Sequence, residues 1–294
     1  MGGCVQWYLD GPHAEQLKNH VREQQEWGNA VRLIDDQEFH FLEPDFHPGK
    51  FSAASFAEHE GFANPVSTTD LLLKKAQAAG AEVLYPCEVS GLDVRAGRIR
   101  AVKTNKGEFN ADVFIIAAGV STSSLAAMAD VQVPLIPAPG LLVHTRPMPQ
   151  LLHRVVVGPD AHLKQYRDGR MVIGDDFGPP KTAVHEYLNS QPLDFPDDSF
   201  RDLHQQRILK QAAQYLPQVL TAPVEKVTIG WRPMPKDGFP IVGFAESCPN
   251  LYVVVTHSGV TLAPILGELV SLEVLDRVKV QMLEPYRLSR FRNA

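Results

Sequence analysis

The segment "NLYVVVTHSGVTLAPILGELV", residues 250–270, decides how this chain is expected to fold. It begins with an apolar run typical of a buried strand, turns at Ser258-Gly259, and continues as a helix with Pro264 in or near its first turn. A tight turn from a strand into a helix presents unpaired main-chain N–H groups at the positive end of the helix dipole. Such a turn suits an anion or an electron-rich ring edge, although ordinary α/β connections share the form.

Helix and strand signals alternate toward the N-terminus. Residues 12–27 predict one helix, and residues 71–79 predict another, with a cap among residues 67–69 and an end at Gly80. A short strand is predicted at 81–85. A helix that runs directly into a strand is typical of an α/β unit.

Strand signals dominate the next stretch. Short alternating runs separated by glycine turns predict strands over residues 89–94, 99–104 and 108–110. The continuous apolar run "DVFIIAAG", residues 112–119, suits a strand covered on both faces. Its last residues are small, so a ligand or another backbone can approach them closely.

The middle of the chain is rich in β signals. Residues 131–180 include a predicted hairpin with Asp168-Gly169 in its turn, and residues 200–216 predict an amphipathic helix. On one hairpin strand His162, Lys164 and Tyr166 alternate and so share a face, which either lines a pocket or is solvated. Because α/β signals lie on both sides of this region, we expect a mixed α/β protein in which a second domain is inserted into a nucleotide-type domain.

Bulk composition narrows the function. The 294-residue chain carries a net charge of −6, which argues against nucleic acid as the main partner. Its three cysteines have no metal-site or disulfide spacing, so we expect free thiols, no metal and a cytoplasmic location. No apolar run approaches the roughly 18 residues that a membrane span needs.

Two residues are candidates for chemistry. Arg232 lies in "GWRPMPKDGFPIVG", residues 230–243, where proline and aromatic neighbours stiffen the chain around a single guanidinium. It either grips a carboxylate with two parallel hydrogen bonds or forms a salt bridge with an acid such as Asp237. His257 precedes the glycine turn and either touches a ligand or bonds loop backbone. The sequence contains no P-loop, H-E-x-x-H or G-x-S-x-G motif, so hydrolase and phosphoryl-transfer functions lack their usual support.

Four segments in order resemble the FAD-dependent amine and amino-acid oxidoreductases, the family of glycine oxidase, D-amino-acid oxidase and sarcosine oxidase. They are "EGFANPVSTTDLLLKKAQAAGAEV" (60–83), "EVSGLDVRAGRIRAVKTNKGEFNADVFIIAAG" (88–119), "GWRPMPKDGFPIVG" (230–243) and "NLYVVVTHSGVTLAPILGELV" (250–270). The third segment is most similar to the glycine-oxidase branch. The resemblance implies a discontinuous, Rossmann-like FAD-binding domain and a substrate domain with a large antiparallel sheet. The FAD-binding domain would comprise residues 64–120 and 226–294, and the substrate domain residues 1–63 and 121–225.

The resemblance also implies which positions hold the cofactor. These are the backbone of Val89 near the adenine, Ala118 and Gly119 at the FAD diphosphate, and the N–H groups of Gly259, Val260, Thr261 and Leu262 on the O2/N1 side of the flavin. Donors at that edge favour the anionic reduced flavin. Sarcosine oxidases tether FAD through a cysteine after the arginine segment. Here Met234-Pro235-Lys236 stands there, so FAD would be bound non-covalently.

The implied reaction is the transfer of a hydride to flavin from the carbon next to the amine of a small amino acid or secondary amine. Arg232 would hold the substrate carboxylate. The resemblance gives no role to His257, where other members carry different side chains; from its place before the glycine turn we expect it to touch a ligand or to tune the charge of the cofactor. The family's glycine-rich βαβ unit has no counterpart before residue 64. One alternative is therefore a non-catalytic or truncated flavoprotein that needs a partner subunit, or forms a homo-oligomer, to complete the nucleotide site. Another is a FAD-dependent 2-hydroxy-acid dehydrogenase, since a hydroxy acid also offers a carboxylate and a hydride.

Overall fold

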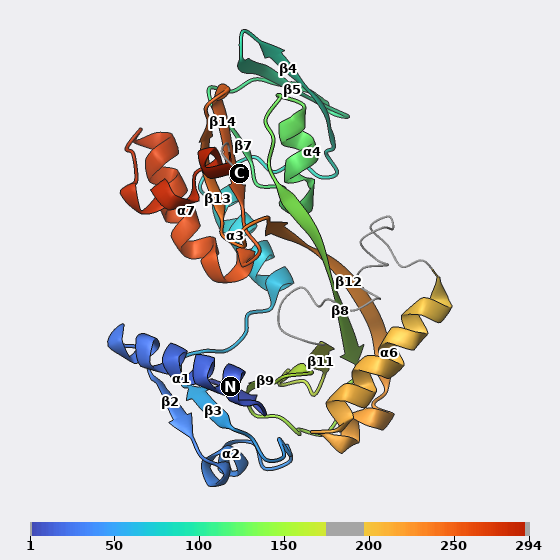
Figure 1. Cartoon of the computed structure of the whole chain (residues 1–294). Coiled ribbons are helices and arrows are strands. Elements are labelled where there is room, and N and C mark those ends of the chain that lie inside the picture. Colours follow the sequence, from blue (N-terminus) through green and yellow to red (C-terminus); the bar gives the residue numbers. More distant parts are fainter. Residues whose placement is uncertain (1, 175–196, 292–294) are drawn as a thin grey trace. The chain divides into compact units, whose positions relative to one another are not determined.

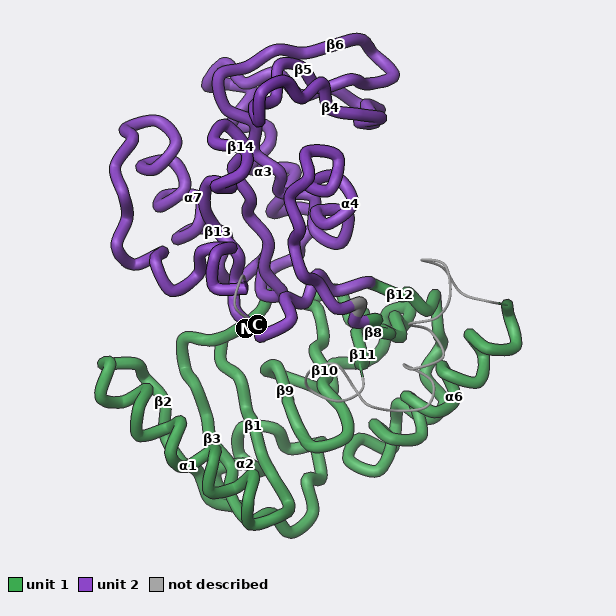
Figure 2. The backbone as a smooth tube through the Cα atoms, turned by 45° about the horizontal axis from the view of Figure 1, so that its top comes forward, with its two compact units in different colours: residues 1–62, 139–230 green, residues 63–138, 231–294 purple. Residues whose placement is uncertain are grey.

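A computed structural model describes residues 2–174 and 197–291 of the chain (Figure 1). The chain forms two compact units, each made of two separate stretches of sequence (Figure 2). Unit 1 contains Met1–Phe62 and Pro139–Gly230, and unit 2 contains Ala63–Ala138 and Trp231–Ala294.

Within the described residues, unit 1 is built on an eight-stranded sheet in the order β12-β8-β11-β10-β9-β1-β3-β2. Its strands are β1 (Cys4–Tyr8), β2 (Val31–Ile34), β3 (Ala53–Ala57), β8 (Leu135–Thr145), β9 (Val155–Val157), β10 (His162–Gln165), β11 (Met171–Gly174) and β12 (Val224–Pro235). β1 pairs in parallel with β9, whereas β1–β3, β2–β3, β9–β10, β10–β11 and β8–β11 are antiparallel. The sheet is therefore mixed. β8 and β12 also carry the chain between the two units.

Among its described residues, unit 1 has three α-helices and one 3-10 helix. They are α1 (Gly11–Glu26), α2 (Asp36–Leu42), α6 (Asp198–Ala213) and the 3-10 helix η2 (Pro217–Thr221). Trp7 of β1 is fully buried, and its ring meets the edges of Phe39, Phe46 and Tyr215 at centroid distances of 6.0, 5.1 and 5.2 Å. Edge-to-face aromatic pairs add to the stabilisation from apolar burial. This cluster fixes β1 against α2 and against the residues that follow α6.

Unit 2 contains two three-stranded sheets within its described residues. One has the order β13-β14-β7, from Ile241–Ala245, Cys248–Val255 and Phe114–Ile116, and the other has the order β4-β5-β6, from Val89–Arg95, Arg98–Thr104 and Gly107–Phe109. The helices are α3 (Pro65–Ala78), η1 (Gly119–Ser121), α4 (Thr122–Ala127), α7 (Gly259–Leu275), η3 (Gln281–Tyr286) and η4 (Leu288–Phe291).

Apolar side chains pack on both faces of β14, the central strand of the β13-β14-β7 sheet. On one face Leu266 of α7 and Leu283 of η3 pack against Tyr252 and Val242. On the other face α4 and β5 contribute to a separate core that includes Val253. This layering holds β14 and the start of α7 in one rigid arrangement.

The expected fold class is confirmed, since the chain is mixed α/β with a large sheet in unit 1 and a strand–turn–helix in unit 2. The helices expected at 12–27 and 200–216, the three strands after residue 88 and the hairpin around Asp168-Gly169 are present. Residues 175–180 of the expected β-rich region lie outside the described residues.

Three local expectations were wrong. The helix expected at 71–79 begins at Pro65, because the Asn64 side chain caps it by accepting the N–H of Ser67 at 3.1 Å. Residues 81–85 form no strand. In the apolar run at 112–119 only Phe114–Ile116 is strand, and Ile115 is 49% exposed, so this strand is not covered on both faces.

Unit 1 also contains a carboxylate with an unusual environment. Glu43 is fully buried after α2, where Oε2 accepts the N–H of His153 at 2.9 Å and Oε1 lies 3.6 Å from Arg154 Nη1. Burial raises the pKa of Glu43 from its ordinary value of 4.5 to about 7, against the lowering effect of these two partners. The folded protein therefore holds a proton on Glu43 that the unfolded chain releases between these two values.

We predict that Glu43 makes the protein less stable as pH rises from 5 to 8. The raised pKa means that the unfolded state binds fewer protons in this window, so up to about 3 kcal/mol of stability is lost on passing through it. Glu43→Gln keeps an oxygen acceptor and removes the titration. Its free energy of unfolding minus that of the wild type, measured by urea denaturation at each pH, should rise across the window. A difference in free energy of unfolding that stays constant with pH would contradict the raised pKa of Glu43. Glu15→Gln, on the exposed side of α1, serves as the control variant.

Candidate functional site

Two turns leave the same edge of the unit 2 sheet. β14 pairs in parallel with β7, with Leu251 opposite Phe114 and Val253 opposite Ile116. In parallel strands the carboxyl ends lie together, so the turn after β7 and the turn after β14 emerge side by side. In open α/β sheets ligands bind in the crevice at this edge.

The turn after β7 requires glycine. Gly119 begins η1 with a φ of +56°, in the left-handed region that favours glycine. A Cβ built on Gly119 would meet no heavy atom within 4 Å. Ala118 precedes it and is exposed. The backbone here is therefore open to a ligand, as the sequence predicts for Ala118 and Gly119.

The turn after β14 presents main-chain donors. α7 has 17 residues, and its N-cap residue Ser258 forms no side-chain cap. The N–H of Leu262 donates to the carbonyl of Ser258 at 2.9 Å, so that donor is used inside the helix. Within the described part of the chain, the N–H groups of Gly259, Val260 and Thr261 have no hydrogen-bond partner. Three open donors at the positive end of a long helix form an anion-binding edge.

Arg232 and His257 lie near one another in unit 2. Arg232 is half-buried in β12, and its Nε donates to the carbonyl of Ala138 at 3.1 Å. His257 is half-buried one residue before the N-cap of α7, with Nδ1 3.4 Å from Ser258 Oγ. Burial, together with the positive charge of Arg232, lowers the pKa of His257. The imidazole is therefore neutral at neutral pH beside a fixed guanidinium.

All nine residues that the sequence predicts to be catalytic or cofactor-binding fall in unit 2. Arg232, His257 and the start of α7 are brought together, and Gly119 lies at the same edge of the sheet. Val89 lies apart from them in the other sheet, as the first residue of β4, where it pairs with Thr104. The carbonyl of Ala138, which anchors Arg232, could not be found from sequence because a main-chain acceptor 94 residues away has no side-chain pattern.

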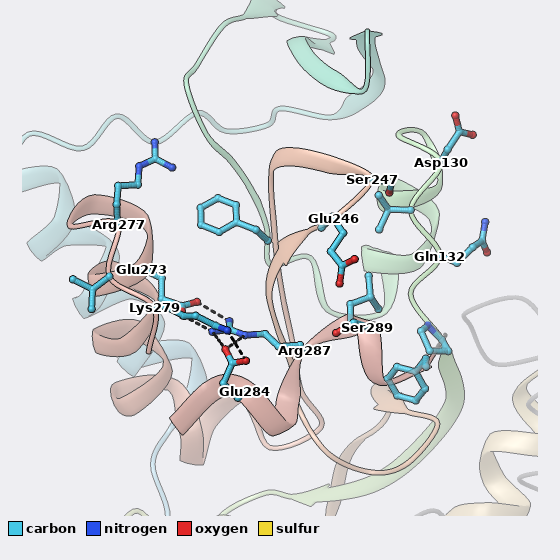
Figure 3. A pocket seen from close by; sticks show the side chains of 17 residues that line it. Asp130, Gln132, Glu246, Ser247, Glu273, Arg277, Lys279, Glu284, Arg287 and Ser289 are labelled. Atoms are coloured by element: carbon cyan, nitrogen blue, oxygen red, sulfur yellow. Dashed lines mark hydrogen bonds and ion pairs between the residues drawn. The ribbon is translucent and has the colours of Figure 1, made fainter. Parts of the chain in front are cut away.

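A cavity of about 770 Å³ in unit 2 lies away from these residues (Figure 3). It lies by the turn between β13 and β14, at the opposite end of β14 from Gly259. Arg287 bonds Glu273 (Nη1–Oε2 2.7 Å) and Glu284 (Nη2–Oε1 3.1 Å), and Tyr252 donates to Glu273 at 2.6 Å. Lys279 Nζ also lies 2.9 Å from Glu284 Oε2, so two positive and two negative side chains balance one another and fasten the C-terminal segment to α7.

The polar face of the unit 1 hairpin is packed against aromatic rings. Lys164 Nζ lies 4.9 Å from the Phe62 ring centroid and 5.4 Å from that of Tyr166. Such cation–π contacts hold the ammonium in place. Among the described residues there is no cluster of three or more metal-ligating side chains, and none of the described helices is long and apolar enough to cross a membrane.

The parallel strand pair, its glycine turn and the uncapped helix start lie at the edge where open α/β sheets bind ligands. The chain belongs to the FAD dependent oxidoreductase family, which matches residues 1–272. The expected family resemblance is therefore confirmed.

Individual relatives span different parts of the chain. The bifunctional protein ThiO/ThiG of Synechocystis sp. is 28% identical over 227 residues, covering 75% of this chain and 32% of that protein. The chain therefore spans about a third of the length of that relative. Glycine oxidase of Geobacillus kaustophilus is 24% identical over 98% of this chain and 73% of its own length. The structure of L-proline dehydrogenase from P. horikoshii superposes with a TM-score of 0.85 at 23% identity, over 99% of this chain and 77% of that one.

The open N–H groups at the start of α7 can be tested one at a time. Proline is favoured at the first helical position, where the main-chain N–H has no intrahelical partner, so Gly259→Pro should remove one donor and keep the helix. We expect FAD affinity, measured by quenching of flavin fluorescence, to fall by about threefold to tenfold.

Gly259→Ala is the matched control. It keeps the N–H, and its Cβ would meet nothing within 4 Å. Its FAD affinity should equal that of the wild type. If the proline and alanine variants bound FAD equally well, the Gly259 N–H would not be a cofactor donor.

Proposed function

We propose that this protein is an oxidoreductase that binds FAD non-covalently and oxidises a small amino acid or secondary amine. The observation that carries the proposal is the row of open donors at Gly259, Val260 and Thr261 next to the half-buried Arg232. The residues fit the cofactor, because Gly119 and Gly259 leave open space where a Cβ would stand. Membership of the family and the similarity to glycine oxidases support the same activity.

In this proposal unit 2 is the FAD-binding domain and unit 1 is the substrate domain. Residues 121–138, which the sequence assigns to the substrate domain, lie in unit 2. Val89, Ala118, Gly119 and residues 259–262 would hold the cofactor, Leu262 by contacts other than its N–H. No covalent tether is proposed, since Cys248 is buried at the far end of β14 and Met234-Pro235-Lys236 follows the arginine.

The substrate would be held by its carboxylate. Anchoring of Nε by Ala138 fixes the plane of the Arg232 guanidinium, which lowers the ordering cost of binding a planar acid group. The lowered pKa of His257 keeps a second positive charge away from the substrate's amine. Bound FAD supplies the two-electron acceptor for the hydride that leaves the carbon next to that amine. The resulting imine hydrolyses in water, so orientation by Arg232 does most of the work that the protein contributes.

Arg232→Ala should lower kcat/KM for amino-acid substrates by about tenfold to a hundredfold, because a charge-assisted pair is lost. FAD affinity should change little. The kcat/KM of Arg232→Lys should lie between those of the wild type and Arg232→Ala, since lysine keeps the positive charge and loses the planar guanidinium. The measurement is steady-state kinetics on a panel of N-methyl amino acids, D-amino acids and 2-hydroxy acids.

Two controls accompany this measurement. Lys236→Ala removes an exposed positive charge from the same segment and should leave kcat/KM unchanged. Amines without a carboxylate should react equally with wild type and Arg232→Ala. If Arg232→Ala had an unchanged KM for amino acids, Arg232 would not be the residue that binds the substrate carboxylate. If the wild type turned over 2-hydroxy acids faster than amino acids, the protein would be a 2-hydroxy-acid dehydrogenase instead.

We also propose that another polypeptide segment completes the nucleotide site. β7 is an edge strand of its sheet, and Ile115 is 49% exposed. α3 has no buried residue in its described structure, and Val66, Leu71 and Leu72 are 76%, 55% and 55% exposed. An unpaired edge strand and an apolar helix face favour docking of a strand–helix–strand segment with a glycine-rich loop, from a partner subunit.

Light scattering tests this second proposal. We expect the isolated chain to self-associate or to bind a hydrophobic dye, and both effects should weaken when Leu71 and Leu72 are changed to Glu. A compact monomer that binds FAD and no dye would contradict it.

We propose a cytoplasmic location, which the free thiols of the three cysteines support.

A further inference from the structure

Unit 2 contains a second polar pocket, of about 380 Å³, at the amino ends of its parallel strands. Its lining includes Arg98, Arg100, Asp112, Asn250 and Arg277. Asp112 precedes β7, and Asn250 lies near the start of β14. β14 has 8 residues and α7 has 17, so each spans about 25 Å. The pocket is therefore about 25 Å from the open donors of Gly259.

The floor of this pocket is rigid. Asn250 is 3% exposed, and its side chain bonds both main-chain groups of Ile99: Oδ1 accepts the N–H at 3.0 Å and Nδ2 donates to the carbonyl at 2.8 Å. Ile99 is itself 2% exposed. Side chains alternate between the two sides of a strand. Because the Ile99 side chain is buried on one side of β5, the side chains of Arg98 and Arg100 both lie on the other, exposed side.

The third arginine comes from the end of α7. Arg277 follows the C-cap residue Asp276 and has a φ of +57°, in the left-handed region. Its guanidinium lies 5.9 Å from the Phe244 ring centroid, and in Figure 3 it points away from the pair of Glu273 and Arg287. A side chain from a different element thus completes a three-arginine pocket.

The three arginines of the pocket differ from four others in the protein. Arg32, Arg154, Arg287 and Arg290 each form an ion pair. Over residues 2–174 and 197–291, no ion pair is formed by the three guanidinium groups of the pocket, although Asp112 also lines it. Three like charges around a small space repel one another, and that repulsion is relieved by an anion that accepts from several forks.

We propose that the pocket of Arg98, Arg100 and Arg277 binds a small multivalent oxyanion, a phosphate ester or a polycarboxylate, separately from the cofactor. Guanidinium forks match the oxygens of either group. Asp112 would accept a hydrogen bond from a hydroxyl or amino group of the same ligand. This inference does not depend on the proposed oxidase activity.

Isothermal titration of the full chain with inorganic pyrophosphate and with citrate tests the proposal. We expect binding at low ionic strength, and the tighter of the two identifies the ligand as a phosphate or as a carboxylate compound. The Arg98→Ala/Arg100→Ala double variant should bind at least tenfold more weakly. Arg277→Gly should also bind the anion at least tenfold more weakly. It should fold at least as well as the wild type, because glycine favours the positive φ found at position 277.

Controls separate this pocket from general charge and from the cofactor site. Arg95→Ala removes a paired arginine from the same hairpin, and Lys103→Ala removes a charge from the same strand. Both variants should bind pyrophosphate or citrate as tightly as the wild type, and excess FAD should not displace either anion. No binding of either probe, equal loss in the controls, or displacement by FAD would overturn the proposal.

Discussion

The parallel pairing of β14 with β7 is the constraint on which the candidate site depends. It joins strands more than 130 positions apart in the sequence, with Leu251 opposite Phe114. A parallel register brings both carboxyl ends to one edge, so Gly119 and the start of α7 meet there. The same register sends the amino ends, with Asp112 and Asn250, to the opposite edge. One pairing therefore separates the candidate cofactor site from the arginine pocket.

Electrostatics at the cofactor edge follows from local backbone geometry. The α7 N-terminus keeps three open N–H groups because Ser258 forms no side-chain cap. Arg232 adds a full positive charge, and that charge, after burial, lowers the pKa of His257. The edge is thus positive without a second charged side chain. An electron-rich group bound there would be stabilised by dipoles that are already oriented, which costs little reorganisation.

Sequence patterns were most reliable where they combined periodicity with a stop signal. The helix expected at 200–216 is present as Asp198–Ala213, and the hairpin around Gly169 formed as predicted, since each has a strong local cause. The expected strand at 81–85 did not form. A strand needs a neighbour, and an apolar run of five residues does not indicate whether one exists. The helix start was misplaced because Asn64 and Pro65 form a cap that outweighs the later Ser and Thr residues.

By itself, the sequence determined most of the elements, the family and the residue types at the candidate site, because glycine turns, an arginine between a tryptophan and a proline, and an apolar helix are local patterns. Tertiary structure alone decided which of these meet. The anchor of Arg232 is a main-chain carbonyl of Ala138, and the support of Ile99 is the buried side chain of Asn250, 151 positions away. Such partners have no periodicity or motif, since they are selected by three-dimensional proximity. For the same reason the convergence of Arg98, Arg100 and Arg277 becomes visible only in the folded chain.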